Sequence, residues 1–145
     1  MSDPDAFLYD AFISYRQQDP DRSWVRGVLL PGLEAAGLRI CVDFRCFRPG
    51  APLVLEMARA VEESRYTLGV LSPAYLDSNF TELENVLSEH LGLERSERRL
   101  LMVMREPCKP TLRMRARLWL DMTDDSETET NLERLASELR RVQDA

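Results

Sequence analysis

Short apolar runs alternate with stretches of helical periodicity along this chain of 145 residues. The alternation is typical of βα units, in which each strand is joined to a parallel neighbour through a helix that packs on the sheet. Because such crossovers are right-handed, we predict an α/β fold with an open five-stranded parallel sheet, order 2-1-3-4-5, and helices on both faces. The expected strands are Leu8–Ser14, Leu38–Asp43, Tyr66–Leu71, Leu100–Met104 and Leu118–Asp121.

Apolar spacing and residues that typically end helices mark the expected helices. Apolar residues between Trp24 and Leu33 recur at helical spacing, so a helix follows the first strand. Pro31 should kink or end that helix early, and Gly37 is a plausible stop. Further helices are expected at Leu53–Ser64, Asn79–Leu91 and about Glu129–Val142.

Composition narrows the class of protein. Hydrophobic residues make up 44% of the chain and charged residues 30%, which suits one globular domain with a real core. The net charge of −6 argues against non-specific binding to nucleic acid or to an anionic membrane. No apolar run approaches the roughly 18 residues that a membrane helix needs. We therefore expect no nucleic-acid partner and no membrane partner.

The chain has three cysteines, Cys41, Cys46 and Cys108. An odd count without framework spacing favours reduced thiols and a cytoplasmic location. His90 is the only histidine, and no Cys-x-x-Cys pair occurs. The sequence therefore predicts no metal site and no bound cofactor.

The first expected strand stops abruptly at Ser14-Tyr15-Arg16. In open α/β sheets, ligands bind just beyond the carboxyl ends of the strands. This run can therefore bring a serine, an aromatic ring and a guanidinium to the rim of a cleft. The alternative is a buried first strand with a polar exit turn.

Three segments, in order, resemble the motifs of TIR domains, the Toll/interleukin-1 receptor family. They are the first strand with Asp10–Tyr15, the second strand and following loop at Ile40–Gly50, and the stretch Leu71–Phe80 followed by Glu84. The resemblance extends from about Tyr9 to about Arg141 and implies a flavodoxin-like sheet. We expect a TIR domain over residues 6–145, of the bacterial type, similar to the NAD-cleaving branch and belonging to a larger multidomain protein.

Two acids open the third long helix. Asn79 suits the N-cap, and Glu82 stands at the third helical position, from which its side chain can reach back to the cap's amide. Glu84 lies about 200° around the helix from Glu82, beside the inward face that carries Phe80. A carboxylate there is costly unless it is paired or used. The alternative to a functional role is a boundary glutamate paired with an arginine.

The resemblance implies an enzyme. In enzymatic TIR domains the matching glutamate, here Glu84, stands four residues after an aromatic position and cleaves NAD+ at the nicotinamide–ribose bond. Phe80 occupies that aromatic position, where many members have tryptophan. Nicotinamide departs from the positively charged NAD+ as a neutral molecule, so no general acid is required. One carboxylate near the developing oxocarbenium then suffices. The product would be ADP-ribose or a cyclic isomer, made in immune-type or cell-death signalling such as anti-phage defence.

The resemblance also implies a substrate cleft and an assembly surface. The expected substrate-binding residues are Ser14, Tyr15, Arg16, Asp43, Phe44, Arg48, Ser72 and Phe80. The assembly loop, which has no expected role in the core, comprises Phe44, Arg45, Cys46, Phe47, Arg48, Pro49 and Gly50. Exposed aromatic side chains such as those expected in this loop are unusual on a surface that binds nothing. Pro49-Gly50 should form a defined turn. Activity is expected to require homotypic self-association through this loop.

Other classes of function stay open. A non-enzymatic TIR scaffold would signal only by binding other TIR domains; Glu84 at the family position favours the enzyme. A receiver-like or other flavodoxin-type domain needs acids at the first strand's exit, where Ser14-Tyr15-Arg16 stands. Basic residues cluster at Arg95–Arg117 and acids at Asp121–Glu133. These are either solvated faces or complementary surfaces that meet head to tail between copies.

Overall fold

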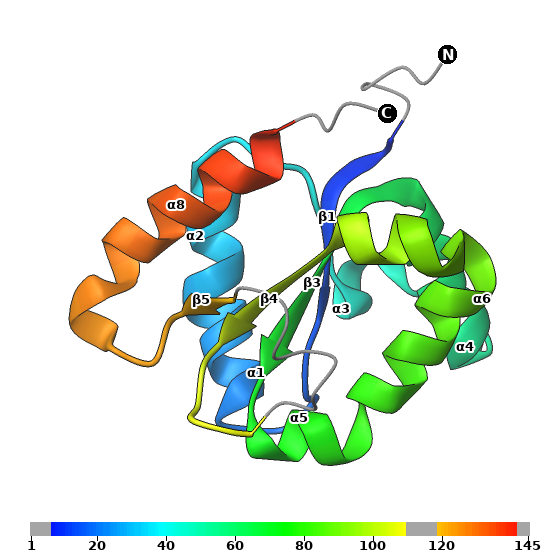
Figure 1. Ribbon diagram of the computed structural model, residues 1–145, viewed down its shortest axis with the longest axis horizontal. Helices are drawn as coiled ribbons and strands as arrows, with labels where there is room; N and C mark the ends of the chain where they lie inside the picture. Colours follow the sequence, from blue (N-terminus) through cyan, green and yellow to red (C-terminus); the bar gives the residue numbers. More distant parts are fainter. Residues whose placement is uncertain (1–6, 110–118, 142–145) are drawn as a thin grey trace.

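The computed structural model describes residues 7–109 and 119–141, which form a parallel sheet in the order β2-β1-β3-β4-β5 with helices on both faces (Figure 1). The predicted fold class and strand order are therefore confirmed. The strands are β1 (Tyr9–Ser14), β2 (Ile40–Cys41), β3 (Ser64–Leu71), β4 (Leu100–Met104) and β5 (Leu120–Asp121).

Pairing explains where the strands differ from prediction. β3 starts earlier than expected because Ser64 pairs with Tyr9 at the start of the central ladder. β2 pairs with β1 only at two positions, and Asp43 already begins a helical turn, so this edge strand is shorter than predicted. Leu118, the expected start of the last strand, lies outside the described residues.

The first crossover corrects the expectation for Pro31. The chain passes through α1 (Asp21–Trp24), the π-helical turn η2 (Val25–Leu29) and α2 (Leu30–Ala35) without ending at the proline. Pro31 stands in the first turn of α2, where its missing N–H is tolerated, and the wider π turn precedes it. Gly37 is the predicted stop: its φ is +88° and its N–H donates to the Glu34 carbonyl at 2.9 Å.

The remaining helices include one that the sequence reading missed. This helix is α5 (Pro73–Ser78). Ser72 caps it by accepting a hydrogen bond from the N–H of Tyr75 at 3.2 Å, and Pro73 stands in its first turn. The expected third helix runs on beyond Leu91, across a break at Gly92, where φ is +76°. The elements are α3 (Asp43–Cys46), α4 (Leu53–Glu63), α5 (Pro73–Ser78), α6 (Phe80–Arg99), η3 (Asp125–Glu127) and α8 (Thr128–Arg140).

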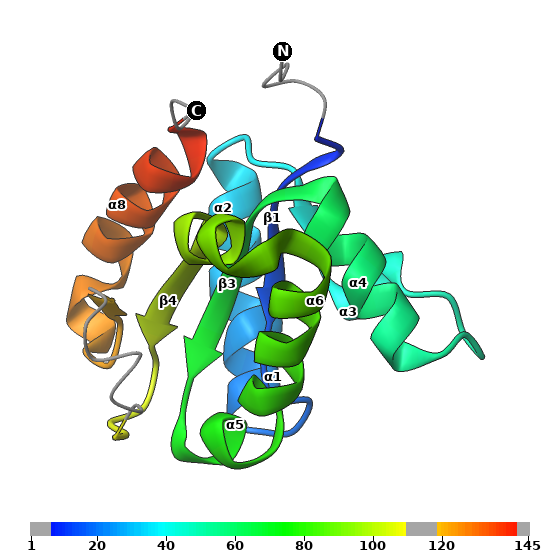
Figure 2. The same ribbon diagram turned by 45° about the vertical axis from the view of Figure 1, so that its right-hand side comes forward.

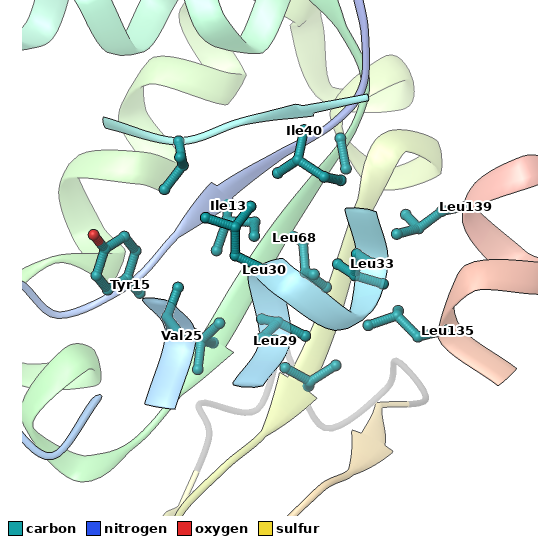
Figure 3. Packing of buried hydrophobic residues seen from close by; sticks show 14 of the residues in the cluster. Ile13, Tyr15, Val25, Leu29, Leu30, Leu33, Ile40, Leu68, Leu135 and Leu139 are labelled. Carbon is teal, nitrogen blue, oxygen red and sulfur yellow. The ribbon is translucent and has the colours of Figure 1, made fainter. Parts of the chain in front are cut away.

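The core has two layers, one on each face of the sheet. Successive β1 residues point to opposite faces, so Ile13 packs under α2 and α8 whereas Phe12 packs under α4, α5 and α6. Figure 3 shows the first layer, in which Leu29 and Leu33 of the predicted helical stripe meet Leu68 of β3. In Figure 2, α4 and α6 lie on the other side of the sheet from α8.

The Asp10 carboxylate joins the start of β1 to Arg39, and this contact predicts that stability depends on pH. Its carboxylate accepts the Arg39 backbone N–H at 2.7 Å and the Arg39 guanidinium at 3.0 Å. Burial raises the pKa of Asp10, but the bonds from Arg39 outweigh it and hold the pKa below the ordinary 3.8. The stabilisation is therefore present above that value and is lost as the pH falls through the lower folded pKa.

We expect Asp10→Asn to lower the free energy of unfolding at pH 7 by about 1–3 kcal/mol, because hydrogen bonds to a charged group are lost. The difference from wild type should shrink as the pH falls toward about 3. Urea unfolding of both proteins across this range measures it. A difference that is the same at every pH would contradict the assignment.

Candidate functional site

A pocket of about 180 Å³ lies at the carboxyl ends of β1 and β2, the edge of the sheet where the sequence predicted a cleft. The exit of β1, the start of α3, the first turns of α4 and the start of α6 all contribute side chains to it. The lining residues are Phe12, Ile13, Ser14, Tyr15, Gln17, Asp43, Phe47, Leu53, Met57, Asn79 and Glu82.

The hydroxyls of two lining residues, Ser14 and Tyr15, have fixed hydrogen-bond partners. Ser14 Oγ and the Tyr75 hydroxyl share a buried hydrogen bond of 2.8 Å. The Tyr15 hydroxyl donates to Asp43 Oδ1 at 2.6 Å. Burial, together with this bond to Asp43, raises the pKa of Tyr15 to about 12, and burial raises the pKa of Tyr75 as well. Both phenols therefore stay protonated at neutral pH and hold the wall in place rather than acting as bases.

Two carboxylates line the pocket, and they differ in their partners. Asp43 accepts from Tyr15 and lies 3.9 Å from the guanidinium of Arg26. Glu82 is half-buried. Among residues 7–109 and 119–141, it has no hydrogen bond and no ion pair.

This finding corrects the predicted capping role of Glu82. Asn79 is the N-cap of α6 as predicted, but its side chain makes no capping bond to the helix. The Asn79 N–H donates instead to the Tyr75 carbonyl at 2.9 Å, because α5 leads directly into α6. Since that amide already has a partner, Glu82 is not needed there and its side chain faces the pocket.

The structure brings together some of the predicted site residues. Ser14, Tyr15, Asp43 and the loop residue Phe47 all line the pocket. Glu84 does not line it: this half-buried side chain lies near Tyr75, where its charge adds to the effect of burial in raising the pKa of the phenol. Its catalytic role stays a prediction.

The other predicted substrate-binding residues do not line the pocket, and two of them have core contacts. Phe80 is buried edge-on against Tyr75, with ring centroids 5.9 Å apart. The Ser72 hydroxyl is buried, donates to Asp21 and caps α5. Arg16 donates to Gln18 at 3.0 Å. Phe44 and Arg48 belong to the outer part of the loop.

The predicted assembly loop is more ordered than a plain surface loop. Its first half is the helical turn α3, and Phe44, 47% exposed, lies 4.4 Å from the guanidinium of Arg26. The Arg48 N–H donates to the buried Glu56 carboxylate at 2.6 Å. A turn closed by the Ala51 N–H and the Arg48 carbonyl, with φ of +83° at Gly50, confirms the predicted Pro-Gly turn.

Phe47 departs from the expectation for this loop. Its ring packs on Phe12 of β1, with centroids 5.8 Å apart, and it joins the hydrophobic cluster under α4 and α6. The residue therefore does have a role in the core, because the turn of α3 directs the chain back over the end of β1.

A family model described as "TIR domain" matches residues 11–136. Toll-like receptor 1 from Homo sapiens is 33% identical over 99 residues, covering 68% of this chain and 12% of that receptor. Toll-like receptor 2 type-2 from Gallus gallus is 28% identical over 131 residues, covering 82% of this chain and 16% of that receptor. The chain thus spans less than a fifth of the length of these relatives.

Solved structures of the same kind superpose on the chain. The TIR domain of the Toll-related receptor TRR-2 from Hydra magnipapillata gives a TM-score of 0.77 at 25% identity, covering 92% of this chain and 100% of that one. A TIR-STING receptor from C. gigas in complex with 2′,3′-cGAMP gives 0.72 at 26% identity, covering 90% and 40%. Within the described ranges, every helix is too short or too polar to cross a bilayer.

Proposed function

Since the chain belongs to the TIR-domain family, we propose that it is an NAD+ glycohydrolase that becomes active when copies assemble. The products are nicotinamide and ADP-ribose or a cyclic isomer. The observation that carries the proposal is the pocket at the end of β1, whose lining includes aromatic residues and carboxylates, a combination that suits a cationic ring on a sugar. Glu84, four residues after Phe80, adds the family's glutamate.

The reaction breaks the bond between ribose C1′ and the ring nitrogen. The bonding electron pair stays on that nitrogen, so the pyridinium leaves as neutral nicotinamide and no acid is needed. Water then attacks C1′ and loses a proton; attack by an atom of the substrate itself gives the cyclic product. In this proposal the Glu84 carboxylate stabilises the oxocarbenium.

The size of the pocket supports a requirement for assembly. Sites for drug-sized ligands occupy about 300–1,000 Å³. A pocket of about 180 Å³ suits the nicotinamide ring alone, and the ribose and diphosphate continue beyond its mouth. In this proposal Glu84 acts there, on the reacting ribose, and a second copy covers the rest of the dinucleotide.

Two surfaces at opposite edges of the sheet suit such a contact. The segment between α3 and α4 projects from the body of the molecule (Figure 2), and it leads into three exposed aliphatic residues, Leu53, Val54 and Leu55. Beside β4 and β5 at the other edge lies a groove of about 380 Å³. It is lined by Leu101, Met102, Trp119, Leu120, Arg134, Leu135 and Glu138. A projection on one edge and a groove on the other favour a head-to-tail contact, which can repeat into a filament.

A non-enzymatic scaffold is the second candidate. It is favoured by the names of the similar proteins, which describe receptors. A scaffold of this kind would use the same projecting segment to bind other TIR domains and would leave NAD+ intact. Release of nicotinamide from NAD+ by the concentrated chain therefore separates the two candidates. The bacterial, NAD-cleaving branch and the cytoplasmic location stay predictions.

A further inference from the structure

We infer that, in the pocket at the end of β1, Glu82 is the residue that favours a positively charged planar ring over a neutral one. For the identity of that ring the inference rests on the proposed function, which makes it the pyridinium of oxidised NAD+. Glu82 would then distinguish the oxidised dinucleotide from the reduced one, whose dihydropyridine ring is neutral.

The first argument is the state of the Glu82 carboxylate. Three other carboxylates that are withdrawn from solvent have cationic or phenolic partners: Asp10 pairs with Arg39, Glu56 with Arg59, and Asp43 with Tyr15. Glu82 lines the pocket, yet within the described part of the chain it has neither an ion pair nor a hydrogen bond. The described residues therefore leave this carboxylate available to an ion from outside the chain. A cation bound in the pocket would pair with it.

The second argument is the character of the walls. Phe12, Tyr15 and Phe47 are among the lining residues, and within the ranges that the structure describes none of the lining residues is an arginine or a lysine. Aromatic faces attract cations. Asp43 adds a second negative charge, which Arg26 offsets only in part at 3.9 Å. Among the described residues the lining therefore carries more negative than positive charge, and the volume of about 180 Å³ suits one substituted ring.

The predicted role of Glu82 is specificity rather than catalysis. Its attraction is greatest for the intact pyridinium and disappears when cleavage makes nicotinamide neutral. An interaction that is stronger with the bound substrate than in the transition state lowers KM and does not raise kcat. Glu82 thus favours capture of the oxidised substrate and release of the product.

The test compares two rings that differ in charge. 1-Methylnicotinamide is a pyridinium cation, whereas nicotinamide is its neutral counterpart, and both can be titrated into the purified chain by ligand-observed NMR. We expect wild type to bind the cation about tenfold more tightly, with a preference that falls as salt is added. Glu82→Gln should reduce the preference to within about twofold. Glu89→Gln, an exposed position on the same helix and outside the pocket, should keep it.

Three results would overturn the inference: equal affinity of wild type for both rings, a preference that survives in Glu82→Gln, or no saturable binding of either ring. Glu84→Gln separates this inference from the proposed function, because it should lose NAD+ cleavage and keep the preference for the cation. A chain that prefers the cation but never cleaves NAD+ would refute the enzyme and leave the subsite standing. Cleavage of NAD+ without any preference for the cation would refute the subsite and leave the enzyme standing.

Discussion

Replacing Glu84 with glutamine is expected to slow NAD+ cleavage at least about a hundredfold while the protein stays folded. Loss of a single group that stabilises transition-state charge typically costs about 10²–10³ in rate. The substitution keeps the size of the side chain, removes the charge and replaces one carboxylate oxygen with an amide NH2 group. Because Glu84 is half-buried at the edge of the apolar face of α6, a neutral amide there should be tolerated. Nicotinamide release measures the rate, and thermal unfolding checks the fold.

Two matched variants on the same helix serve as controls. Glu82→Gln should raise KM several-fold and should not lower kcat, since Glu82 lines the pocket and acts on binding of the charged substrate. Glu89→Gln, exposed and outside the pocket, should leave both constants unchanged. If Glu84→Gln turned over NAD+ at the wild-type rate while Glu82→Gln was inactive, the catalytic carboxylate would be Glu82 and the role given to Glu84 would be wrong.

The second large effect concerns assembly: specific activity should rise with protein concentration, and Leu55→Asp should flatten that rise. Leu55 is 61% exposed in the first turn of α4, beside the projecting loop. Burying such a side chain at a contact is worth about 1.5–3 kcal/mol, and an unpaired charge in its place opposes the contact. An acidic residue is also favourable in the first turn of a helix, so the monomer should remain folded. Phe47→Asp is a poorer test, because Phe47 packs on Phe12.

Leu8→Asp is the matched control. Leu8 is 60% exposed, immediately before β1 and away from the projecting segment. It should therefore lower neither activity nor self-association. Light scattering and nicotinamide release, recorded together over about a hundredfold dilution, give the two readouts. A constant rate per molecule across that range, with wild type monomeric throughout, would contradict the assembly requirement.

Much of the fold follows from local patterns in the chain. Apolar runs such as Leu100–Met104 coincide with a strand, and the stripe that includes Leu29 and Leu33 is buried as its spacing predicted. The helix α5 was missed although Ser72-Pro73 is itself a helix-start signal, because the segment was interpreted as the exit of the third strand. The helical segment continues past Pro31 because a π-helical turn precedes it, and no residue pattern predicts such a turn.

The site was predictable only in part, because its residues are brought together by tertiary contacts. Ser14 and Tyr15 reach the rim because strand ends meet at one edge of a parallel sheet. Glu82 was assigned to a cap because the neighbouring helix α5, which supplies the partner of the Asn79 amide, was not foreseen. Leu53 and Met57 share a helix face at i and i+4, but only the fold places that face over the end of β1.

The most direct measurement of the central claim is the fate of NAD+ incubated with the concentrated wild-type chain, with products separated by retention time and identified by mass. The account predicts that nicotinamide appears together with an equal amount of ADP-ribose or a cyclic isomer, and that Glu84→Gln at the same concentration produces neither. NAD+ that stays intact while light scattering shows the wild-type chain fully assembled would contradict the enzyme and favour the scaffold.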